Sequence, residues 1–325
     1  MAWTAGTCRS HLDYRAGVVF SDARSLRDGL KTVAEAAGSP GRAAAGKVAF
    51  AYSGDARHRA DVVLALYETE PVVRAVLDRC EVAFGEIRGD SLLDIVFGRA
   101  GSEGLLDDPA WAQPTAYALE CALTALWSSV GIRPNVVVGR DTGELAAAQA
   151  AGVFSLEEGL GFSAARAANG SLDVTAKTPS VDLISHVTGR LITSDEAGDA
   201  EYWQRQVDEP VPFRNCIDTL AELGVQVVVG IGPAALPGPE IVQAWPTISK
   251  GGEAPDVIDS LGFAADENTD ANDGGITEAF ARVFETGQAV SFKGLFAGES
   301  RRRISLPSYP FQRRRHWIEA NNRST

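Results

Sequence analysis

Short apolar runs alternate with longer amphipathic segments along most of the chain. Strands are expected at 47–52 (KVAFAY), at 135–138 (NVVV) and within 181–189 (VDLISHVTG) and 225–233 (VQVVVGIGP), each leading into a turn. Helices are expected at 62–68, 72–84, 117–129 and 144–153, and the third is apolar enough to be buried. Short strands that are uniformly apolar are typical of a parallel sheet covered on both faces. The pattern therefore predicts an α/β fold with a mainly parallel sheet.

The two ends of the chain are less regular. Residues 16–20 form a short apolar stretch, 26–37 have a helical pattern, and the segment 38–46 (GSPGRAAAG) reads as a linker. The segment 265–275 (ADENTDANDGG) is expected to be a loop. Two prolines in 306–317 (LPSYPFQRRRHW) exclude regular structure there.

Composition and charge reduce the number of function classes that fit the chain. The chain has 325 residues, 45% of them hydrophobic, which is ample for a sizeable core. Its formal net charge of −13 argues against a general nucleic-acid binder, because binding phosphates requires a basic face. The tail is basic, with Arg301–Arg303 and Arg313–Arg315. Two interpretations remain open for it: a solvated tail, or a segment that docks onto an acidic partner.

The cysteines indicate no metal or disulfide framework. Cys8, Cys80, Cys121 and Cys216 are scattered and form no C-x-x-C motif. The turn 230–233 (GIGP) lacks the Lys and Ser/Thr of a phosphate loop, so no cofactor is expected. We see no secretory leader and no apolar run of membrane-spanning length, and we expect a cytoplasmic protein that does not bind membranes.

The most informative segment joins the strand at 135–138 to the helix at 144–153. The turn between them, GRDTG (139–143), has the G-x-x-x-G spacing of a nucleophile elbow. Such a turn raises one side chain at the start of a helix, where backbone N–H groups can stabilise an oxyanion. The raised residue is usually a Ser activated by a His, but here it is Asp141.

The segment GRDTGELAAAQAAGVFSLEEGL (139–160) resembles the pattern G-H-S-x-G-E-L-A-A-A-x-x-A-G-x-x-S-L-E-D of polyketide synthase acyltransferases, the malonyl-CoA:acyl carrier protein transacylase-like family. The likeness extends to KVAFAYSGDARHRADVVLALYETEPVVRAVLDRCE, LLDDPAWAQPTAYALECALTALWSSVGIRPNVVVG and AEYWQRQVDEPVPFRNCIDTLAELGVQVVVGIGP. The resemblance implies a discrete protein with the α/β-hydrolase-like large subdomain of an acyltransferase, mainly a parallel sheet with helices on both faces.

The resemblance also implies a division of the chain. Residues 1–46 are similar to the linker that joins a ketosynthase to its acyltransferase. Residues 47–245 correspond to the acyltransferase core, and 246–325 to the linker-like tail that follows it and that ends in LPSYPFQRRRHWIE. In the family, these ends pack against the ketosynthase.

Two catalytic positions of the family are altered. Asp141 replaces the Ser nucleophile and Arg140 the His before it. Asp55, in Gly54-Asp55-Ala56-Arg57-His58, replaces the oxyanion Gln of G-Q-G-S-Q. A carboxylate is a poor nucleophile for acyl transfer, and an anion in place of an amide donor would destabilise a tetrahedral intermediate.

The catalytic His of the family lies in a small ferredoxin-like subdomain, inserted before a strand that TPSVDLISHVTG matches. Here Thr178 follows Asp141 by only 37 residues, so most of that subdomain is expected to be deleted near 167–178. The four histidines, His11, His58, His186 and His316, do not occupy the catalytic slot. His186 replaces an Asn of the family, and a structural role is expected for it.

Arg166 matches the Arg that binds the malonyl carboxylate in the family. It would either keep that role or pair with Asp141 and close the old pocket, because a buried carboxylate requires a partner.

Two functions remain open. In the first, the protein is a pseudo-acyltransferase of polyketide biosynthesis that binds a ketosynthase or another synthase component. A second copy of itself and an acyl carrier protein are further candidate partners. In the second, it is a repurposed enzyme that cyclises, dehydrates or hydrolyses a polyketide. Catalysis would then use Asp141, Arg166 and His58, with Arg140, Asp55, Arg57, His186 and Gln113 as binding residues.

Overall fold

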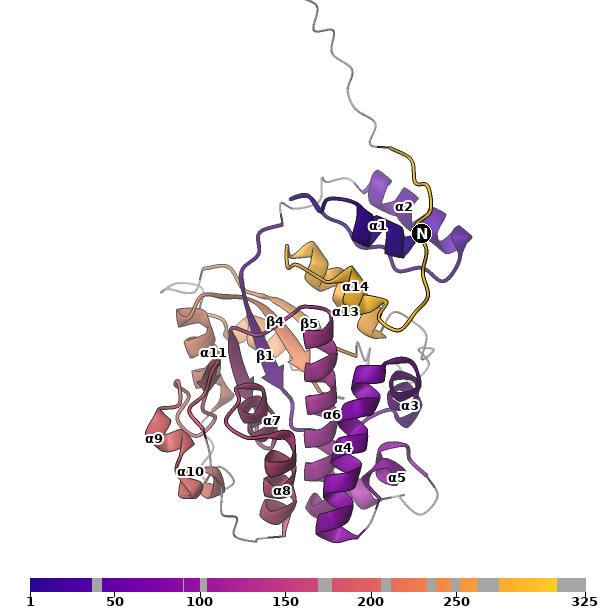
Figure 1. Ribbon diagram of the computed structural model, residues 1–325. Coiled ribbons are helices and arrows are strands. Elements are labelled where there is room, and N and C mark those ends of the chain that lie inside the picture. The colour runs from indigo at the N-terminus through magenta and orange to yellow at the C-terminus, as the bar shows by residue number, and fades with distance from the viewer. Residues whose placement is uncertain are drawn as a thin grey trace, which may run out of the picture.

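A single parallel sheet organises the molecule. The computed structural model describes residues 1–36, 43–89, 91–99, 104–168, 177–205, 212–232, 238–246, 252–261 and 275–308. The sheet has the order β3-β2-β1-β4-β5, and every neighbouring pair is parallel (Figure 1). The strands are β1 (Lys47–Tyr52), β2 (Val136–Gly139), β3 (Asp182–Ile184), β4 (Val225–Ile231) and β5 (Asp256–Asp259). The predicted α/β fold with a parallel sheet is confirmed.

Helices cover both faces of this sheet, as the apolar strands predict. The helices α11 (Phe213–Glu222) and α12 (Gly238–Ala244) pack on the face to which Ala49 and Ala51 of β1 point. The opposite face, which carries Val48, Phe50 and Tyr52, packs against the larger group of helices. That group comprises α3 (Ala60–Thr69), α4 (Pro71–Arg88), α5 (Leu92–Val96), α6 (Pro109–Ser129), α7 (Gly143–Ala150), α8 (Leu156–Ala167) and α13 (Gly275–Glu285).

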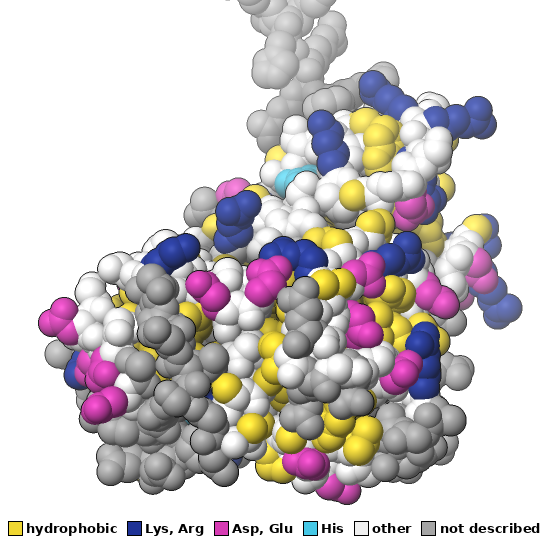
Figure 2. Space-filling view, turned by 60° about the horizontal axis from the view of Figure 1, so that its bottom comes forward, with side chains coloured by type: hydrophobic (Ala, Val, Ile, Leu, Met, Phe, Trp, Pro, Cys, Tyr) yellow, Lys and Arg dark blue, Asp and Glu magenta, His cyan; other side chains and the backbone are white. Residues whose placement is uncertain are grey.

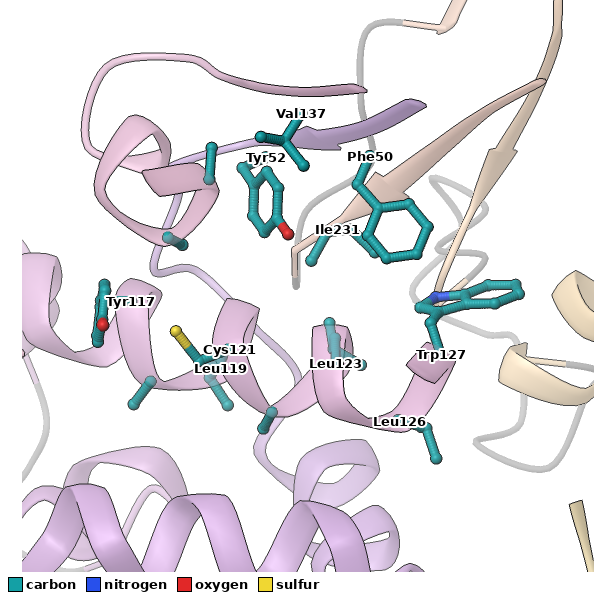
Figure 3. Packing of buried hydrophobic residues seen from close by; sticks show 14 of the residues in the cluster. Phe50, Tyr52, Tyr117, Leu119, Cys121, Leu123, Leu126, Trp127, Val137 and Ile231 are labelled. Carbon is teal, nitrogen blue, oxygen red and sulfur yellow. The ribbon is translucent and has the colours of Figure 1, made fainter. Parts of the chain in front are cut away.

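The main core forms where α6 crosses beneath the sheet. Phe50, Val137 and Ile231 of three neighbouring strands point toward α6 (Figure 3). Trp127 of α6 is fully buried, and its Nε1–H donates to Ser260 Oγ at 2.8 Å, which satisfies its one polar group. Because α6 is buried on nearly all sides, its apolar composition follows from its position in the core.

The two ends of the chain meet at the edge of the sheet where the strands begin. Figure 1 shows α1 (Ala2–Cys8) and α2 (Ala23–Glu35) beside α13 and α14 (Phe292–Leu295). His11 contacts the rings of Phe284 and Phe292 edge-on, at centroid distances of 5.1 and 5.2 Å. Arg9 donates to the carbonyl oxygens of Leu306 and Pro307. We call residues 1–36 and 275–308 together the end layer.

The sheet reaches further along the chain than the sequence indicates. Strand β5 at 256–259 pairs with β4, so part of the segment assigned to the tail belongs to the sheet. Its sequence, DVID, is too short and too polar to be recognised as a strand. The expected loop at 265–275 falls almost wholly outside the described residues, as does the tail beyond residue 308.

The connection from α8 to β3 is short. Helix α8 ends at Ala167 and β3 begins at Asp182, so 14 residues join the two. The described part of the chain contains no second sheet. After β3, the chain forms α9 (Ser194–Ala197) and α10 (Ala200–Arg205) before it returns to the sheet. Among the described helices, none has the length and apolar character to cross a membrane.

Candidate functional site

The turn after β2 holds Asp141 in a left-handed backbone conformation. Asp141, at φ = 48°, is the one non-glycine residue with a positive φ within the described ranges. A side chain on Gly143 would place its Cβ 2.8 Å from the carbonyl oxygen of Tyr52, and one on Gly139 would overlap the backbone of Glu144. Both glycines are therefore required for the close approach of β2, the turn and α7. The G-x-x-x-G segment forms the expected elbow, with Asp141 raised at its tip.

An open cleft of about 730 Å³ lies over the elbow. Its walls come from the loop after β1, η1 (Leu105–Asp107), the first turn of α6, the elbow and the start of α11. The Asp141 side chain is 63% exposed there. The cleft brings together five of the predicted site residues, namely Asp55, Arg57, Gln113, Arg140 and Asp141.

His186 lies directly beside the elbow, at the end of β3. The backbone N–H of Asp141 donates to His186 Nδ1 at 3.3 Å, and this nitrogen lies 3.8 Å from Asp141 Oδ1. Burial lowers the pKa of His186, the Asp141 carboxylate raises it and Arg140 lowers it further. A neutral imidazole with Nδ1 as the acceptor carries its proton on Nε2. An unprotonated ring nitrogen therefore faces Asp141 at neutral pH.

A buried polar network fixes the position of His186. The carboxylate of Glu144, on α7, is fully buried and accepts the backbone N–H of His186 at 3.1 Å. Tyr202 of α10 donates to Glu144 Oε1 at 2.5 Å, and its hydroxyl lies equally close to Ser185 Oγ. Burial and the Glu144 carboxylate raise the pKa of Tyr202, so the hydroxyl keeps its proton. The network ties the helix after the elbow to the residue beside it.

Arg166 lies behind the cleft, on α8. Its Nε donates to Gln113 Oε1 at 3.2 Å, and Gln113 lines the cleft. Burial lowers the pKa of Arg166 to about 10, and the nearby carboxylates of Glu144 and Asp141 oppose this shift. Arg166 therefore remains charged at neutral pH within the field of both carboxylates, while the cleft beside Asp141 stays open.

The loop after β1 carries a charge pair at the rim. Arg57 binds Asp55 with both Nε and Nη2, at 3.1 and 2.6 Å, and this contact lowers the pKa of Asp55. His58 points elsewhere, because its ring nitrogens lie 2.7 Å from the carbonyl oxygens of Ala56 and Val96. His58 does not line the cleft, so the structure does not bring it to the other predicted site residues.

The sequence does not mark Glu120 as a site residue. This residue of α6 is fully buried, and its Oε1 accepts from the N–H of Gly54 at 2.7 Å and from Ser53 Oγ at 3.3 Å. Its Oε2 has no hydrogen-bond partner among the described residues. Burial raises the pKa of Glu120 to about 8. The available signal was a single acidic residue within the apolar run 117–129.

Glu144 offered a similar signal, as the one charged residue of the Ala-rich helix after the elbow. No group of three or more His, Cys, Asp or Glu side chains is arranged to hold a metal ion in the described segments.

The segment that contains the elbow is similar to a known protein family. Residues 49–170, from β1 through the elbow to just beyond α8, match the family model described as acyl transferase domain. Polyketide synthase GfsA of Streptomyces halstedii is 26% identical over 421 aligned positions, which cover 98% of this chain and 6% of that protein. Phenolphthiocerol synthesis polyketide synthase type I Pks15/1 of Mycobacterium marinum is 27% identical over 402 positions, covering 95% of this chain and 18% of that protein.

The chain thus spans a small part of the length of both relatives. Both alignments are longer than the 325 residues of this chain, so they include positions at which only the relative has a residue.

Solved structures show the same fold. The acyl transferase domain of ZmaA superimposes with a TM-score of 0.81 at 18% identity, covering 94% of this chain and 90% of that one. The acyltransferase domain from the second module of the salinomycin polyketide synthase gives 0.77 at 24% identity, with 95% and 91% covered. The chain therefore has the fold of acyltransferase domains, and residues 49–170 match the acyl transferase domain model.

Proposed function

We propose that this protein is a pseudo-acyltransferase of polyketide biosynthesis, which acts by binding another synthase component and not by malonyl transfer from a serine. Asp141 carries the proposal, because it occupies the raised position of the elbow where the family that the chain resembles has its Ser. Attack of a carboxylate on a thioester gives a mixed anhydride, and its negative charge opposes the oxyanion that forms. Asp55 adds a second anion at the rim of the same cleft.

Among the described residues, the other parts of a serine mechanism have no counterpart in the cleft either. His186 stands where the family has Asn, and His58 is held by two backbone carbonyl groups away from the cleft. The 14-residue connection between α8 and β3 leaves no room for the small subdomain that supplies the catalytic His in the family. The long alignments with GfsA and Pks15/1 support the same interpretation.

The end layer is the surface proposed for docking. Ten large hydrophobic side chains are exposed on the described residues, and six of them lie in this layer: Met1, Leu12, Tyr14, Val19, Leu30 and Ile304. The layer contains ten Lys and Arg against seven Asp and Glu, in a chain of net charge −13. In the upper part of Figure 2, basic side chains surround hydrophobic ones.

Such a surface fits a partner that is apolar and acidic. The relatives are polyketide synthases, so a ketosynthase or another synthase component is the proposed partner. An acyl carrier protein and a second copy of this chain are the alternatives for the same binding assay.

The test combines chemistry and binding. We expect neither a covalent adduct nor CoA release when the protein is incubated with malonyl-, methylmalonyl- or acetyl-CoA and followed by intact mass. We expect capture of a ketosynthase or other polyketide synthase component to be lost in Leu30→Asp, because Leu30 is 54% exposed in the end layer. Val82→Asp is the matched control, since Val82 is 64% exposed on α4 and outside that layer. Acyl transfer by the wild type, or equal loss of capture in both variants, would contradict the proposal.

A second candidate function follows from the open cleft. A cleft that had only decayed could be closed by its own side chains, whereas here Asp141 is largely exposed at its floor. In this alternative, the protein is a repurposed enzyme that acts on a polyketide intermediate by cyclisation, dehydration or hydrolysis, with Asp141 as the reacting group.

A further inference from the structure

The carboxylate of Asp141 is presented to the cleft without a close partner. Its nearest charged neighbours are Arg140 Nε at 3.9 Å and His186 Nδ1 at 3.8 Å, both beyond hydrogen-bond distance. The elbow holds this residue at a positive φ, and a strained backbone at a cleft is a feature that functional residues share. The carboxylate oxygens are therefore open to a ligand.

The chemistry of a carboxylate decides which ligand can react. Attack on an acyl carbon forms an anhydride, which is more reactive than the thioester it replaces. Attack on a saturated carbon that carries a leaving oxygen forms an ordinary ester, and opening a strained ring makes that step favourable. Once it has formed, the carbonyl group of this ester lies on residue 141 itself, at the raised position of the elbow.

The elbow can then act on its own ester. Among the described residues, the N–H of Thr142 at the start of α7 has no acceptor, and it can donate to an oxyanion that develops on residue 141. His186 Nδ1 lies 3.8 Å from Asp141 Oδ1. Once it releases the backbone N–H of Asp141, which it accepts at 3.3 Å, this nitrogen can take a proton from a water molecule that attacks the carbonyl carbon. Arg140 lies on the other carboxylate oxygen and can stabilise a substrate alkoxide.

We propose that this cleft hydrolyses epoxides through an alkyl ester formed on Asp141, an inference that rests on the second candidate function above. In the first step, one Asp141 oxygen bonds to an epoxide carbon, the ring C–O bond breaks, and the alkoxide takes a proton from solvent. In the second step, water adds to the ester carbonyl carbon while its proton passes to His186. The intermediate then releases the diol, whose oxygen takes the proton back from His186. Asp141 is left as a carboxylic acid, which gives its proton to solvent and returns as a carboxylate.

The cleft suits such a substrate in size and lining. Its volume of about 730 Å³ holds a ligand of drug-like size. Leu106, Pro109 and Phe213 provide apolar surface beside the charged elbow. The substrate class is therefore an epoxide on an apolar chain.

The experiment uses the full chain and the chromogenic epoxide 4-nitrophenyl glycidyl ether. A single turnover of the wild-type protein in heavy-oxygen water should place heavy oxygen in the peptide that contains Asp141, because water attacks the ester of that residue. His186→Gln should accumulate the protein–probe ester, seen as an intact-mass increase equal to the probe. Asp141→Asn should lower turnover by at least about 100-fold, whereas Asp195→Asn, a change at an exposed carboxylate on α9 outside the cleft, should leave it unchanged.

Label that is absent from the Asp141 peptide after turnover, or that appears equally in the Asp107 peptide, would overturn the proposal. So would a failure of the wild type to consume the probe. The labelling result needs no variant, so it stands even if the replacement of buried His186 impairs folding. Capture of a partner by the end layer, measured on Asp141→Asn, separates the two proposals: intact capture without labelling refutes the cleft chemistry alone.

Discussion

Replacement of Glu120 by Gln should make the protein more stable, and increasingly so as the pH rises. Glu120 is fully buried beneath the loop that forms one wall of the cleft. Its Oε1 accepts two hydrogen bonds while its Oε2 has no partner among the described residues, so the ionised form is poorly compensated. Gln has nearly the same shape, can accept from Gly54 and Ser53 through its carbonyl oxygen, and does not ionise.

The direction and the size of this change in stability follow from the raised pKa of Glu120. The folded protein holds the proton of Glu120 up to a pH of about 8, whereas the unfolded chain releases it near 4.5. The stability that Glu120 contributes is therefore fully present below pH 4.5 and is lost as the pH rises to about 8. At about 1.4 kcal/mol per pH unit, the variant should gain about 4 kcal/mol on the wild type between pH 5 and pH 8, and then no more.

Thermal unfolding at several pH values measures this difference. For a domain of this size, about 4 kcal/mol corresponds to a shift in Tm of about 8 °C, so the gap between the two melting curves should widen from pH 5 to pH 8 and stay constant at pH 9. Glu68→Gln is the control, because Glu68 is exposed on α3. A gap that does not change with pH would refute the reasoning, since it would mean that Glu120 ionises equally in the folded and unfolded states.

Three further changes test the elbow and its support. Tyr202→Phe leaves Glu144 Oε1 without its buried donor and should cost about 2 kcal/mol in the free energy of unfolding, measured by urea denaturation. Asp141→Gly should be about 1 kcal/mol more stable than Asp141→Ala in the same assay, because the positive φ of 48° suits glycine; equal stabilities would contradict the strain argument. Asp141→Ser should not gain malonyl transfer, because Asp55 still places an anion in the cleft where the family has its oxyanion Gln; an acyl-enzyme in the intact mass would contradict this prediction.

The parts of the fold that the sequence predicts are those with a local signal. The runs at 47–52 and 225–233 are apolar on both faces, and each contains a strand of the parallel sheet. The elbow follows from Gly139 and Gly143, because a side chain at either position would clash with neighbouring backbone atoms. The resemblance to acyltransferases predicts the fold. The catalytic positions at which this sequence differs from the family leave the function open.

What the sequence does not reveal depends on contacts between distant residues. His58 and Arg57 are adjacent, yet one bonds to backbone carbonyl groups while the other binds Asp55 at the rim. No feature of the local sequence indicates that Arg57 lines the cleft and His58 does not. Glu120 could be recognised as a buried acid only once α6 was known to cross beneath Ser53. The half-polar strand β5 is recognisable only by its pairing with β4.

Because the end layer joins residues about 300 positions apart, it can form only after the ribosome has synthesised the chain between them. Arg9 reaches the carbonyl of Leu306, and Thr4 accepts from the backbone of Ile304, across separations of 297 and 300 residues. A ribosome that adds about 5–20 residues per second completes such a stretch in roughly 15–60 s. During that interval the first helices have no docking surface, and their apolar side chains are available to chaperones. The cleft, whose elbow and β3 lie within the first 190 residues, can begin to assemble well before the end layer closes.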